Sequence, residues 1–322
     1  MIGLIVLLQA LTVAVSGPPS SPEYLPLHVA AAEGYFTREG LDVTLKSTRA
    51  EPGAAEALSQ GQTDLAATSL DAVLRFGPRG ASQAPRIVLG LTAAPPVALV
   101  VPASQKEIVK SIEDVVNTRV GISTPGAPEQ AWFAWLLARS GLSVAQVWII
   151  SHGGRGLLHA METGDVHAGL VHEPYASRLL ADGQTRLLAD LRSPAAVAAL
   201  GPLTLNAAVF ARSDRRPRDR DLTAFARAVL AAERRIAAAD PRELATRLPR
   251  RIVAPPEDFA DRVAALRTLY LPDGVVTAAQ VQETIALSRG HHPLPVTARV
   301  PRAEELLLME PLRRALAAPA PR

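Results

Sequence analysis

The stretch that decides the fold is YLPLHVAAAEGYFTREGLDV, residues 24–43. Apolar residues recur through it at helical spacing as far as Phe36, which predicts a helix from Tyr24 to Glu39. Gly40 follows, and glycine is the residue that most often ends a helix in the left-handed conformation. The next residues, Leu41 to Leu45, alternate apolar and polar side chains and predict a strand. The stretch is therefore one helix-to-strand step of an α/β chain.

The same alternation continues on both sides of this stretch. Upstream, Leu11 to Ser16 is β-prone and predicts a first strand that ends at Gly17-Pro18-Pro19. Downstream, the pattern predicts a helix at 53–60, a strand at 65–68, a helix at 70–76 and a strand at 87–91. Strands separated by helices predict an α/β fold with largely parallel sheets.

About a hundred residues later the sequence repeats some of these features. Gly141-Leu142 repeats Gly40-Leu41, and the segment 160–164, followed by a strand at 168–171, repeats the segment 57–61 and its strand. Identity between the copies is low, so chance similarity of ordinary αβ units is an equal alternative. The functional interpretation is two similar α/β lobes, whose loops after the strand ends face a shared cleft, where open α/β sheets bind ligands.

Two apolar segments are predicted to cross between the lobes, at 92–102 and 203–211. They set the expected boundaries: lobe I at 11–95 and 205–322, and lobe II at 96–204. Further strands are expected in lobe II at 118–123, 147–150, 168–171 and 185–188. The region after residue 211 is expected to hold helices at 222–238, 258–269 and 277–288.

Composition excludes several classes of protein. The chain of 322 residues is 48% hydrophobic and 20% charged, which is typical of a globular protein and excludes disorder. It has no cysteine, which excludes disulfides, thiolate metal sites, catalytic thiols and a lipid-modified N-terminal cysteine. The net charge is only +3 and aromatic residues are 4%, so we expect no nucleic-acid partner.

The N-terminus allows two interpretations. Residues 1–10 are mostly apolar and too short to span a bilayer, and we interpret them as a weak or truncated remnant of a signal peptide. The first basic side chain is Arg38, so the positive region that a secretory signal needs is missing. An intracellular protein with an extended first strand is about as compatible with these residues.

In lobe I, candidate ligand-binding residues lie where strands end and helices begin. Ser20 and Ser21 follow the first strand, with Tyr24 just after them, and Ser69 and Asp71 follow the strand at 65–68. Serine at such a place caps the helix, or its hydroxyl and the free backbone N–H groups hold a ligand. Both roles remain open.

In lobe II, the loop at 123–130 is the richest in polar and turn-forming residues. Contact with a small polar ligand is expected through four of its residues, Ser123, Thr124, Gly126 and Gln130. Trp132 and Trp135, just beyond this loop, are expected in the core.

A second group follows the strand at 168–171 and comprises His172, Glu173 and Tyr175. We interpret His172 as a hydrogen-bonding residue, because no second ligand stands at metal spacing. Glu173 is expected to contact a ligand amine or to pair with an arginine across the cleft. No metal and no cofactor is expected.

Four motifs carry a resemblance to a known family: YLPL at 24–27, EGYF at 33–36, EGLDV at 39–43 and EPYA at 173–176. Over roughly residues 11–290 the chain resembles the periplasmic solute-binding proteins of ABC importers. The subgroup is the NMT1/THI5-like one, which serves nitrate, sulfonates, taurine and pyrimidine precursors of thiamine. The resemblance implies a two-lobed, type II periplasmic-binding-protein fold. The family usually has tryptophan or another bulky residue where this chain has His172, which puts the ligand's identity in doubt.

The resemblance implies a periplasmic receptor that captures a small polar or anionic organic ligand, of sulfonate, nitrate-like or pyrimidine type, in the interlobe cleft. Its expected partners are that small-molecule ligand, an ABC permease and the ATPase subunit of the permease. Such a receptor is not an enzyme, and the sequence has no Gly-x-Ser-x-Gly or His-Glu-x-x-His motif. The alternative is an enzyme of the menaquinone-pathway type on the same fold, with Glu173 as a proton-transfer group.

Overall fold

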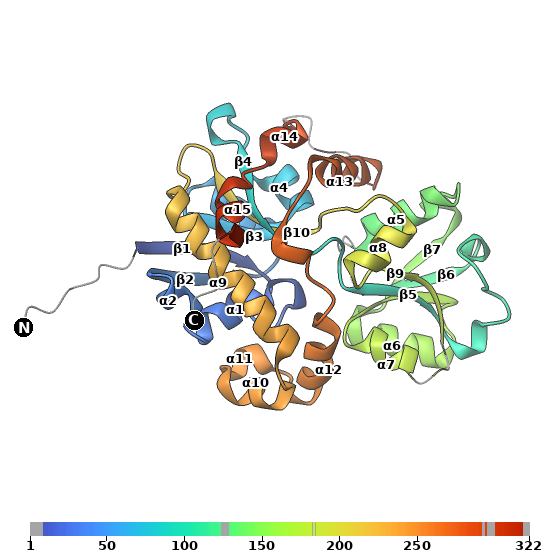
Figure 1. Ribbon diagram of the computed structural model, residues 1–322. Helices are drawn as coiled ribbons and strands as arrows, with labels where there is room; N and C mark the ends of the chain where they lie inside the picture. The colour runs from blue at the N-terminus through green and yellow to red at the C-terminus, as the bar shows by residue number, and fades with distance from the viewer. Residues whose placement is uncertain are drawn as a thin grey trace, which may run out of the picture. The chain divides into compact units, whose positions relative to one another are not determined.

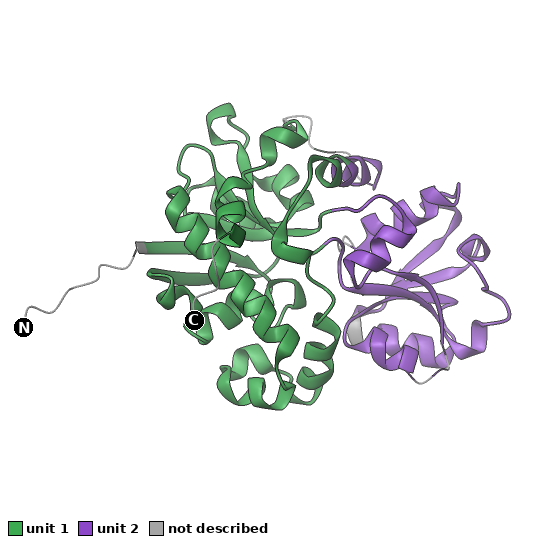
Figure 2. Ribbon diagram, in the orientation of Figure 1, with its two compact units in different colours: residues 1–92, 205–282, 294–322 green, residues 93–204, 283–293 purple. Residues whose placement is uncertain are grey.

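The computed structural model describes residues 9–123, 129–181, 183, 185–291, 294 and 300–317. The chain divides into two compact units (Figure 2). Unit 1 comprises residues 1–92, 205–282 and 294–322, and unit 2 comprises residues 93–204 and 283–293. The chain therefore leaves unit 1 after Thr92 and returns at Leu205, close to where the crossing segments were expected.

Unit 1 contains a five-stranded sheet in the order β2-β1-β3-β10-β4 (Figure 1). Its strands are β1 (Gln9–Ser16), β2 (Leu41–Thr48), β3 (Leu65–Ser69), β4 (Pro85–Gly90) and β10 (Ala207–Arg212). β1 is parallel to both β2 and β3, whereas β10 is antiparallel to β3 and β4. Strands β1, β2, β3 and β4 therefore end at the same edge of the sheet, here named the unit 1 edge.

Unit 2 repeats this arrangement in a sheet of order β7-β6-β8-β5-β9. Its strands are β5 (Val97–Val101), β6 (Arg119–Ile122), β7 (Trp148–Ser151), β8 (Ala168–His172) and β9 (Arg186–Asp190). β6 is parallel to β7 and β8, and β5 is antiparallel to β8 and β9. Strands β6, β7, β8 and β9 therefore end at the same edge of this sheet, here named the unit 2 edge. β8 thus stands where β3 stands in unit 1, and the α/β class with two similar lobes is confirmed.

The helices of unit 1 follow the strands and then fill the return segment. They are η1 (Pro22–Tyr24), α1 (Leu25–Ala32), α2 (Tyr35–Arg38), α3 (Glu51–Ser59), α4 (Leu70–Phe76), η2 (Ala81–Gln83), α9 (Asp219–Ala238), α10 (Pro241–Arg247), α11 (Arg250–Val253), α12 (Pro256–Leu266), η6 (Pro272–Gly274), α14 (Ala303–Leu306) and α15 (Glu310–Ala317). α9 packs along α1, α2 and α15 (Figure 1).

The helix predicted from Tyr24 to Glu39 is two helices with a short 3₁₀ turn before them. Gly34 adopts a φ of 73°, which an α-helix cannot contain, so α1 ends before it and α2 begins after it. The break turns Phe36 onto α9, where its ring stacks on Phe225 with centroids 5.2 Å apart. The apolar spacing thus predicts the helical residues correctly, but it does not show that Gly34 divides them into two helices.

The helices of unit 2 are η3 (Ala103–Gln105), η4 (Glu113–Val115), α5 (Glu129–Arg139), η5 (Val144–Gln146), α6 (Gly153–Thr163), α7 (Tyr175–Ala181) and α8 (Pro194–Leu200). The division between the units falls inside α13 (Ala278–His291). The Trp135 indole donates a hydrogen bond to Glu283 at 2.9 Å, which fastens the second part of α13 to α5. The expected lobes therefore differ from the units at residues 93–95 and 283–293, both of which group with unit 2.

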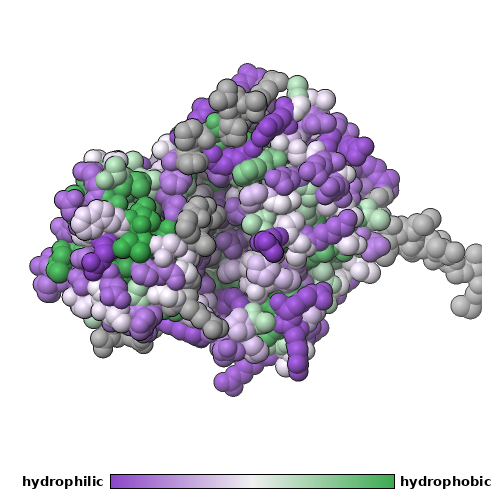
Figure 3. All heavy atoms as spheres, turned by 180° about the vertical axis from the view of Figure 1, so that it is seen from behind, coloured by the Kyte–Doolittle hydropathy of each residue, from purple (hydrophilic) through white to green (hydrophobic). Residues whose placement is uncertain are grey.

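Both sheets have apolar strands, as sheets covered on both faces require. Every residue of β3, β5 and β10 is buried. Most of the surface seen in Figure 3 is polar, with hydrophobic residues gathered on one part of unit 2. Within the described ranges, no helix is long and apolar enough to cross a membrane.

Candidate functional site

The unit 1 edge centres on the carboxyl group of Glu51, the first residue of α3. Ser69, the last residue of β3, donates its hydroxyl hydrogen to Glu51 Oε2 at 2.5 Å, and the Tyr24 hydroxyl lies 3.4 Å from Oε1. Thr68 Oγ1 donates to the backbone carbonyl of Glu51 at 3.0 Å. These bonds tie the start of α3 to the end of β3 and to η1, so the carboxyl group has a fixed position.

Glu51 is a weak acid in this setting. Its pKa is raised to about 7, mainly by burial and also by the nearby charges of Glu23 and Asp71, while the hydrogen bonds from Ser69 and Tyr24 only partly oppose the rise. Burial and the charge of Glu51 also raise the pKa of Tyr24 well above its ordinary value. Near neutral pH the carboxyl group can therefore accept a hydrogen bond when ionised or donate one when protonated.

The other candidates of unit 1 surround this group. Ser69 also caps α4, because its Oγ accepts a hydrogen bond from the Ala72 amide at 3.1 Å. Asp71 forms an ion pair with Arg75 at 2.8 Å. Ser20 and Ser21 are partly exposed, and their hydroxyls bond to no other described residue. Ser69 thus caps the helix, and its contact with a ligand stays a prediction.

The unit 2 edge centres on Glu129, the first residue of α5. Its side chain is 1% exposed, and its Oε1 accepts a hydrogen bond from Ser123 Oγ at 2.5 Å and lies 3.4 Å from His172 Nε2. Burial alone would raise the pKa of Glu129, but the hydrogen bond and charge of His172, with the Ser123 hydroxyl, hold it below its ordinary value. Glu129 is therefore ionised at neutral pH. Its second oxygen, Oε2, is buried and has no hydrogen-bond partner among the described residues.

Glu173 is engaged inside unit 2. Arg192 Nη1 donates to its Oε1 at 2.9 Å, and Ser177 donates through both its hydroxyl, at 2.8 Å, and its backbone N–H, at 3.2 Å. Arg192 also forms a two-pronged ion pair with Asp190, the last residue of β9, at 2.9 Å on both prongs. Glu173 does pair with an arginine, as one of the two expectations had it, but the arginine belongs to its own unit.

The remaining candidates of unit 2 lie around these two groups. Gln130 is the partly exposed second residue of α5, and Tyr175 begins α7 and packs against a core cluster of unit 2 with Arg178 over its ring. Trp132 and Trp135 are buried, as predicted. Thr124 and Gly126 lie outside the described residues.

Three side chains of this candidate site were not predicted from the sequence: Glu51, Glu129 and Arg192. Glu51 and Glu129 each begin a helix, where an acidic residue ordinarily interacts with the helix dipole. Only the order of the strands shows that the last residues of β3 and β8 reach them. Arg192 follows the end of β9, and its position after a strand was the available signal.

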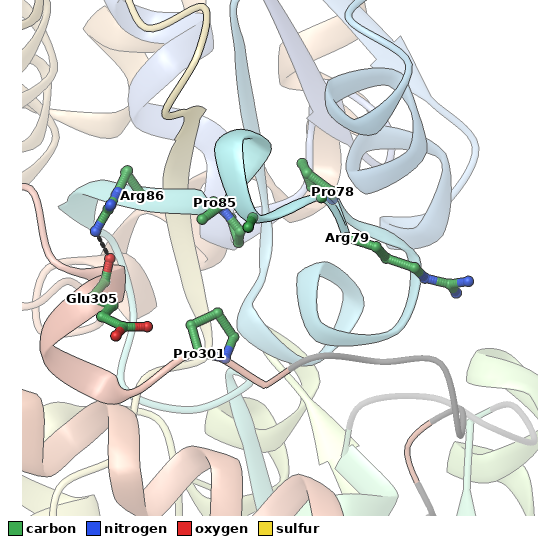
Figure 4. A pocket seen from close by; sticks show the side chains of 9 residues that line it. Pro78, Arg79, Pro85, Arg86, Pro301 and Glu305 are labelled. Carbon is green, nitrogen blue, oxygen red and sulfur yellow. Dashed lines mark hydrogen bonds between the residues drawn. The ribbon is translucent and has the colours of Figure 1, made fainter.

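No metal centre is formed by the described side chains, since they hold no cluster of three or more histidine, aspartate or glutamate residues. A cavity of about 270 Å³ lies at the start of β4, at the opposite edge of the unit 1 sheet (Figure 4). Arg86 lies at one side of it and donates hydrogen bonds to the Glu305 carbonyl and to Ser213 Oγ. Its other labelled walls are mainly proline, Pro78, Pro85 and Pro301. Arg79 and Glu305 are the other charged residues of its lining.

A family model described as NMT1/THI5 like matches residues 21–243 of this chain. The chain belongs to the NMT1/THI5-like family. The match begins in the loop after β1 and covers both edges described above. Membership thus agrees with the resemblance drawn from the sequence motifs.

Solved structures that share the fold are mainly of binding proteins. The periplasmic aliphatic sulphonate-binding protein SsuA of Escherichia coli has a TM-score of 0.69 at 18% identity, covering 92% of this chain and 97% of its own. The periplasmic nitrate-binding protein NrtA of Synechocystis PCC 6803 has a TM-score of 0.61 at 15% identity, covering 96% and 88%. The desulfurization enzyme DSZB has a TM-score of 0.58 at 15% identity, covering 96% and 99%. At these identities the likeness shows the two-lobed fold alone. Among curated proteins, none matches the chain.

Proposed function

We propose that this protein is the solute-binding receptor of an ABC importer. It acts outside the cytoplasmic membrane, captures a small polar organic ligand and delivers it to a permease driven by an ATPase subunit. Membership of the NMT1/THI5-like family supports this, as do neighbours of the same fold that are named for binding sulfonate and nitrate. The proposed ligand-binding residues include Ser20, Ser21, Tyr24, Ser69 and Asp71 in unit 1.

One observation carries the proposal. In each unit the last residue of the third parallel strand, Ser69 or His172, contacts the carboxyl group of a glutamate that begins a helix. Carboxyl ends of parallel strands are where open α/β sheets bind their ligands. A carboxyl group fixed by strand-end partners is the kind of convergent polar group that orients a small ligand.

The chemistry of the unit 1 edge favours one class of ligand. Glu51, with Glu23 and Asp71 near it, makes this edge rich in hydrogen-bond acceptors. A bare oxyanion beside an ionised carboxylate is unfavourable. A ligand with N–H groups, such as an aminopyrimidine or an amine-bearing sulfonate, therefore suits this edge better than nitrate when Glu51 is ionised.

The arrangement around Glu129 does not favour the enzyme alternative. In a nucleophilic triad a histidine lies between the hydroxyl and the carboxylate, so that it can take the proton of the hydroxyl. Here Glu129 Oε1 lies between the Ser123 hydroxyl and His172 Nε2. An ionised carboxylate of lowered pKa is a poor base for a serine hydroxyl. Glu173, the proton-transfer candidate, is already ion-paired with Arg192.

Calorimetric titration with taurine, an alkanesulfonate, nitrate and an aminopyrimidine, at pH 6 and pH 8, tests the proposal. We expect one of the N–H-bearing compounds to bind, and more tightly at pH 8, where Glu51 is ionised. Glu51→Gln and His172→Ala should each weaken that ligand by about two- to tenfold, the effect of one hydrogen bond. Turnover of a bound compound, or unchanged affinity in both variants, contradicts the proposal.

A further inference from the structure

A second cavity lies in unit 1, away from the carboxyl group of Glu51. It has a volume of about 350 Å³, is open to solvent, and is lined by the later part of α1, the outer strand β2 and the start of α11. Its walls are mostly apolar: Pro19, Ala31, Ala32, Val43, Leu45, Pro249 and Ile252. The volume falls in the range of pockets that hold small organic molecules.

One polar residue that lines this cavity, His28, has a side-chain nitrogen without a hydrogen-bond partner among the described residues. His28 on α1 is only 5% exposed, and its Nε2 is buried with no hydrogen-bond partner in the part of the chain that the structure describes. A buried polar atom in a folded protein is ordinarily hydrogen-bonded, so an unpartnered nitrogen on a residue that lines a cavity points to a missing group. Burial, together with the charge of Arg251, lowers the pKa of His28 to about 4, so the ring is neutral at physiological pH.

The residues that line the cavity carry positive charge and no negative charge. Arg251 on α11 is exposed and forms no ion pair with another described residue, and Ser47 is the remaining polar residue of the walls. The ten lining residues include no carboxylate. The acidic group that follows Ala32, Glu33, is already paired with Arg247 at 3.0 Å. The positive charge of Arg251 is therefore available to a ligand.

We infer that this cavity binds a small organic anion with an apolar body, whose carboxylate pairs with Arg251 and accepts a hydrogen bond from the His28 imidazole. A buried hydrogen bond to a neutral imidazole and a charge-assisted contact to a guanidinium complement each other on one carboxylate. The apolar walls, with Ala31 and Ala32 on one side and Val43 and Leu45 on the other, accommodate the body of the ligand. This site lies in unit 1 alone and does not depend on the receptor function proposed above.

Benzoate is a suitable probe, with benzamide and benzylamine as neutral and cationic analogues of the same shape. Titration of the full chain should show binding of benzoate at least tenfold tighter than benzamide, and no binding of benzylamine. Arg251→Glu should weaken benzoate by at least tenfold. Arg250→Glu changes the neighbouring exposed arginine, which does not line the cavity, and should leave the affinity within twofold.

A second variant separates the cavity from general charge effects. Ala32→Phe fills the cavity from an exposed helix position and should abolish benzoate binding without loss of fold. NMR of the His28 ring should show its pKa rise when benzoate binds, because a nearby carboxylate favours the charged imidazole.

Three results would overturn the inference: no benzoate binding, equal effects of Arg251→Glu and Arg250→Glu, or loss of binding in Glu51→Gln but not in Ala32→Phe. The last result would place the anion at the unit 1 edge. Conversely, failure of every solute at the two edges, with benzoate binding intact, would reject the receptor proposal and leave this site standing.

Discussion

The ends of β3 and β8 occupy the same place in two sheets of the same strand order, and they carry opposite electrostatics. In unit 1, Ser69 donates a hydrogen bond to Glu51, whose pKa is raised to about 7. In unit 2, His172 faces Glu129, whose pKa is held below its ordinary value. The residue after each strand differs too, since Leu70 is buried in the core and Glu173 is buried in an ion pair. A shared topology thus places carboxyl groups, while their partners decide whether those groups are charged.

The largest effect is expected from Glu173→Ala, which removes one partner of the buried ion pair at the unit 2 edge. Arg192 would keep only Asp190 as a charged partner, and α7 would lose the bond to its Ser177 amide. Breaking a buried pair in this way costs about 3 kcal/mol or more of unfolding free energy. All three tryptophans, Trp132, Trp135 and Trp148, belong to unit 2, so urea unfolding followed by tryptophan fluorescence measures this unit.

The matched control for that measurement is Glu162→Ala, because the Glu162 side chain is 70% exposed and lies in the same unit. It should change the unfolding free energy by less than about 0.5 kcal/mol, as surface substitutions do. A Glu173→Ala protein as stable as this control would show that the unit 2 edge does not depend on the ion pair.

The next effect concerns Glu51 and is a dependence on pH. A carboxyl group whose pKa is raised in the folded state binds more protons there than in the unfolded chain, so stability falls as pH rises from about 4.5 to about 7. Glu51→Gln removes this loss and keeps a hydrogen-bond acceptor for Ser69. The variant should gain on the wild type across that window by no more than about 3 kcal/mol.

Glu56→Gln, an exposed change on the same helix, is the control and should follow the wild type at every pH. Denaturant unfolding followed by circular dichroism at pH 4.5, 6 and 8 measures the difference. Parallel curves for Glu51→Gln and the wild type would mean that Glu51 is not the acid described here.

A smaller effect on stability is expected from His172→Ala. This change acts on Glu129, whose pKa is lowered, whereas that of Glu51 is raised. Loss of the histidine should raise the pKa of Glu129 and cost about 1 kcal/mol at pH 7, the worth of one hydrogen bond. Because the pKa of Glu129 is lowered by folding, its stabilising contribution exists above the unfolded value and is lost as pH falls through the folded pKa. In His172→Ala the free energy of unfolding should therefore fall less steeply as the pH is lowered.

Carboxyl carbon NMR of Glu129, with urea unfolding at pH 7 and pH 3.5, measures both quantities. His159→Ala is the control, since that side chain is 75% exposed on α6 of the same unit. An unchanged Glu129 resonance in His172→Ala would show that the 3.4 Å contact has no electrostatic consequence.

The fold was largely predictable because strand and helix periodicity are local properties. The helix at 70–76 was predicted with the bounds it has, and the strand that begins at Leu41 was recognised but extends three residues further. The short helices α10 and α11 were not predicted, since prolines and arginines hide their apolar spacing. Local spacing cannot show such elements where tertiary packing decides them.

The site was only partly predictable, because its hydrogen bonds join residues far apart in sequence. Ser69 and His172 were chosen from their position after strands. Their glutamate partners, Glu51 and Glu129, lie 18 and 43 residues away, and only the order of the strands brings them together. Arg192 was missed for the same reason, since it reaches Glu173 across the ends of β8 and β9.

The smallest effect on stability, and the sharpest test of the comparison, is expected from Ser20→Ala and Ser21→Ala. Ser69 has two structural partners, so Ser69→Ala should cost about 1–2 kcal/mol of unfolding free energy. The hydroxyls of Ser20 and Ser21 bond to no other described residue, so their loss should cost less than about 0.5 kcal/mol. If they contact the solute, the same changes weaken its binding by about two- to tenfold, which titration and thermal unfolding of the same samples measure together. A loss of affinity without loss of stability identifies ligand-binding residues, whereas unchanged affinity would assign the loop after β1 no part in binding.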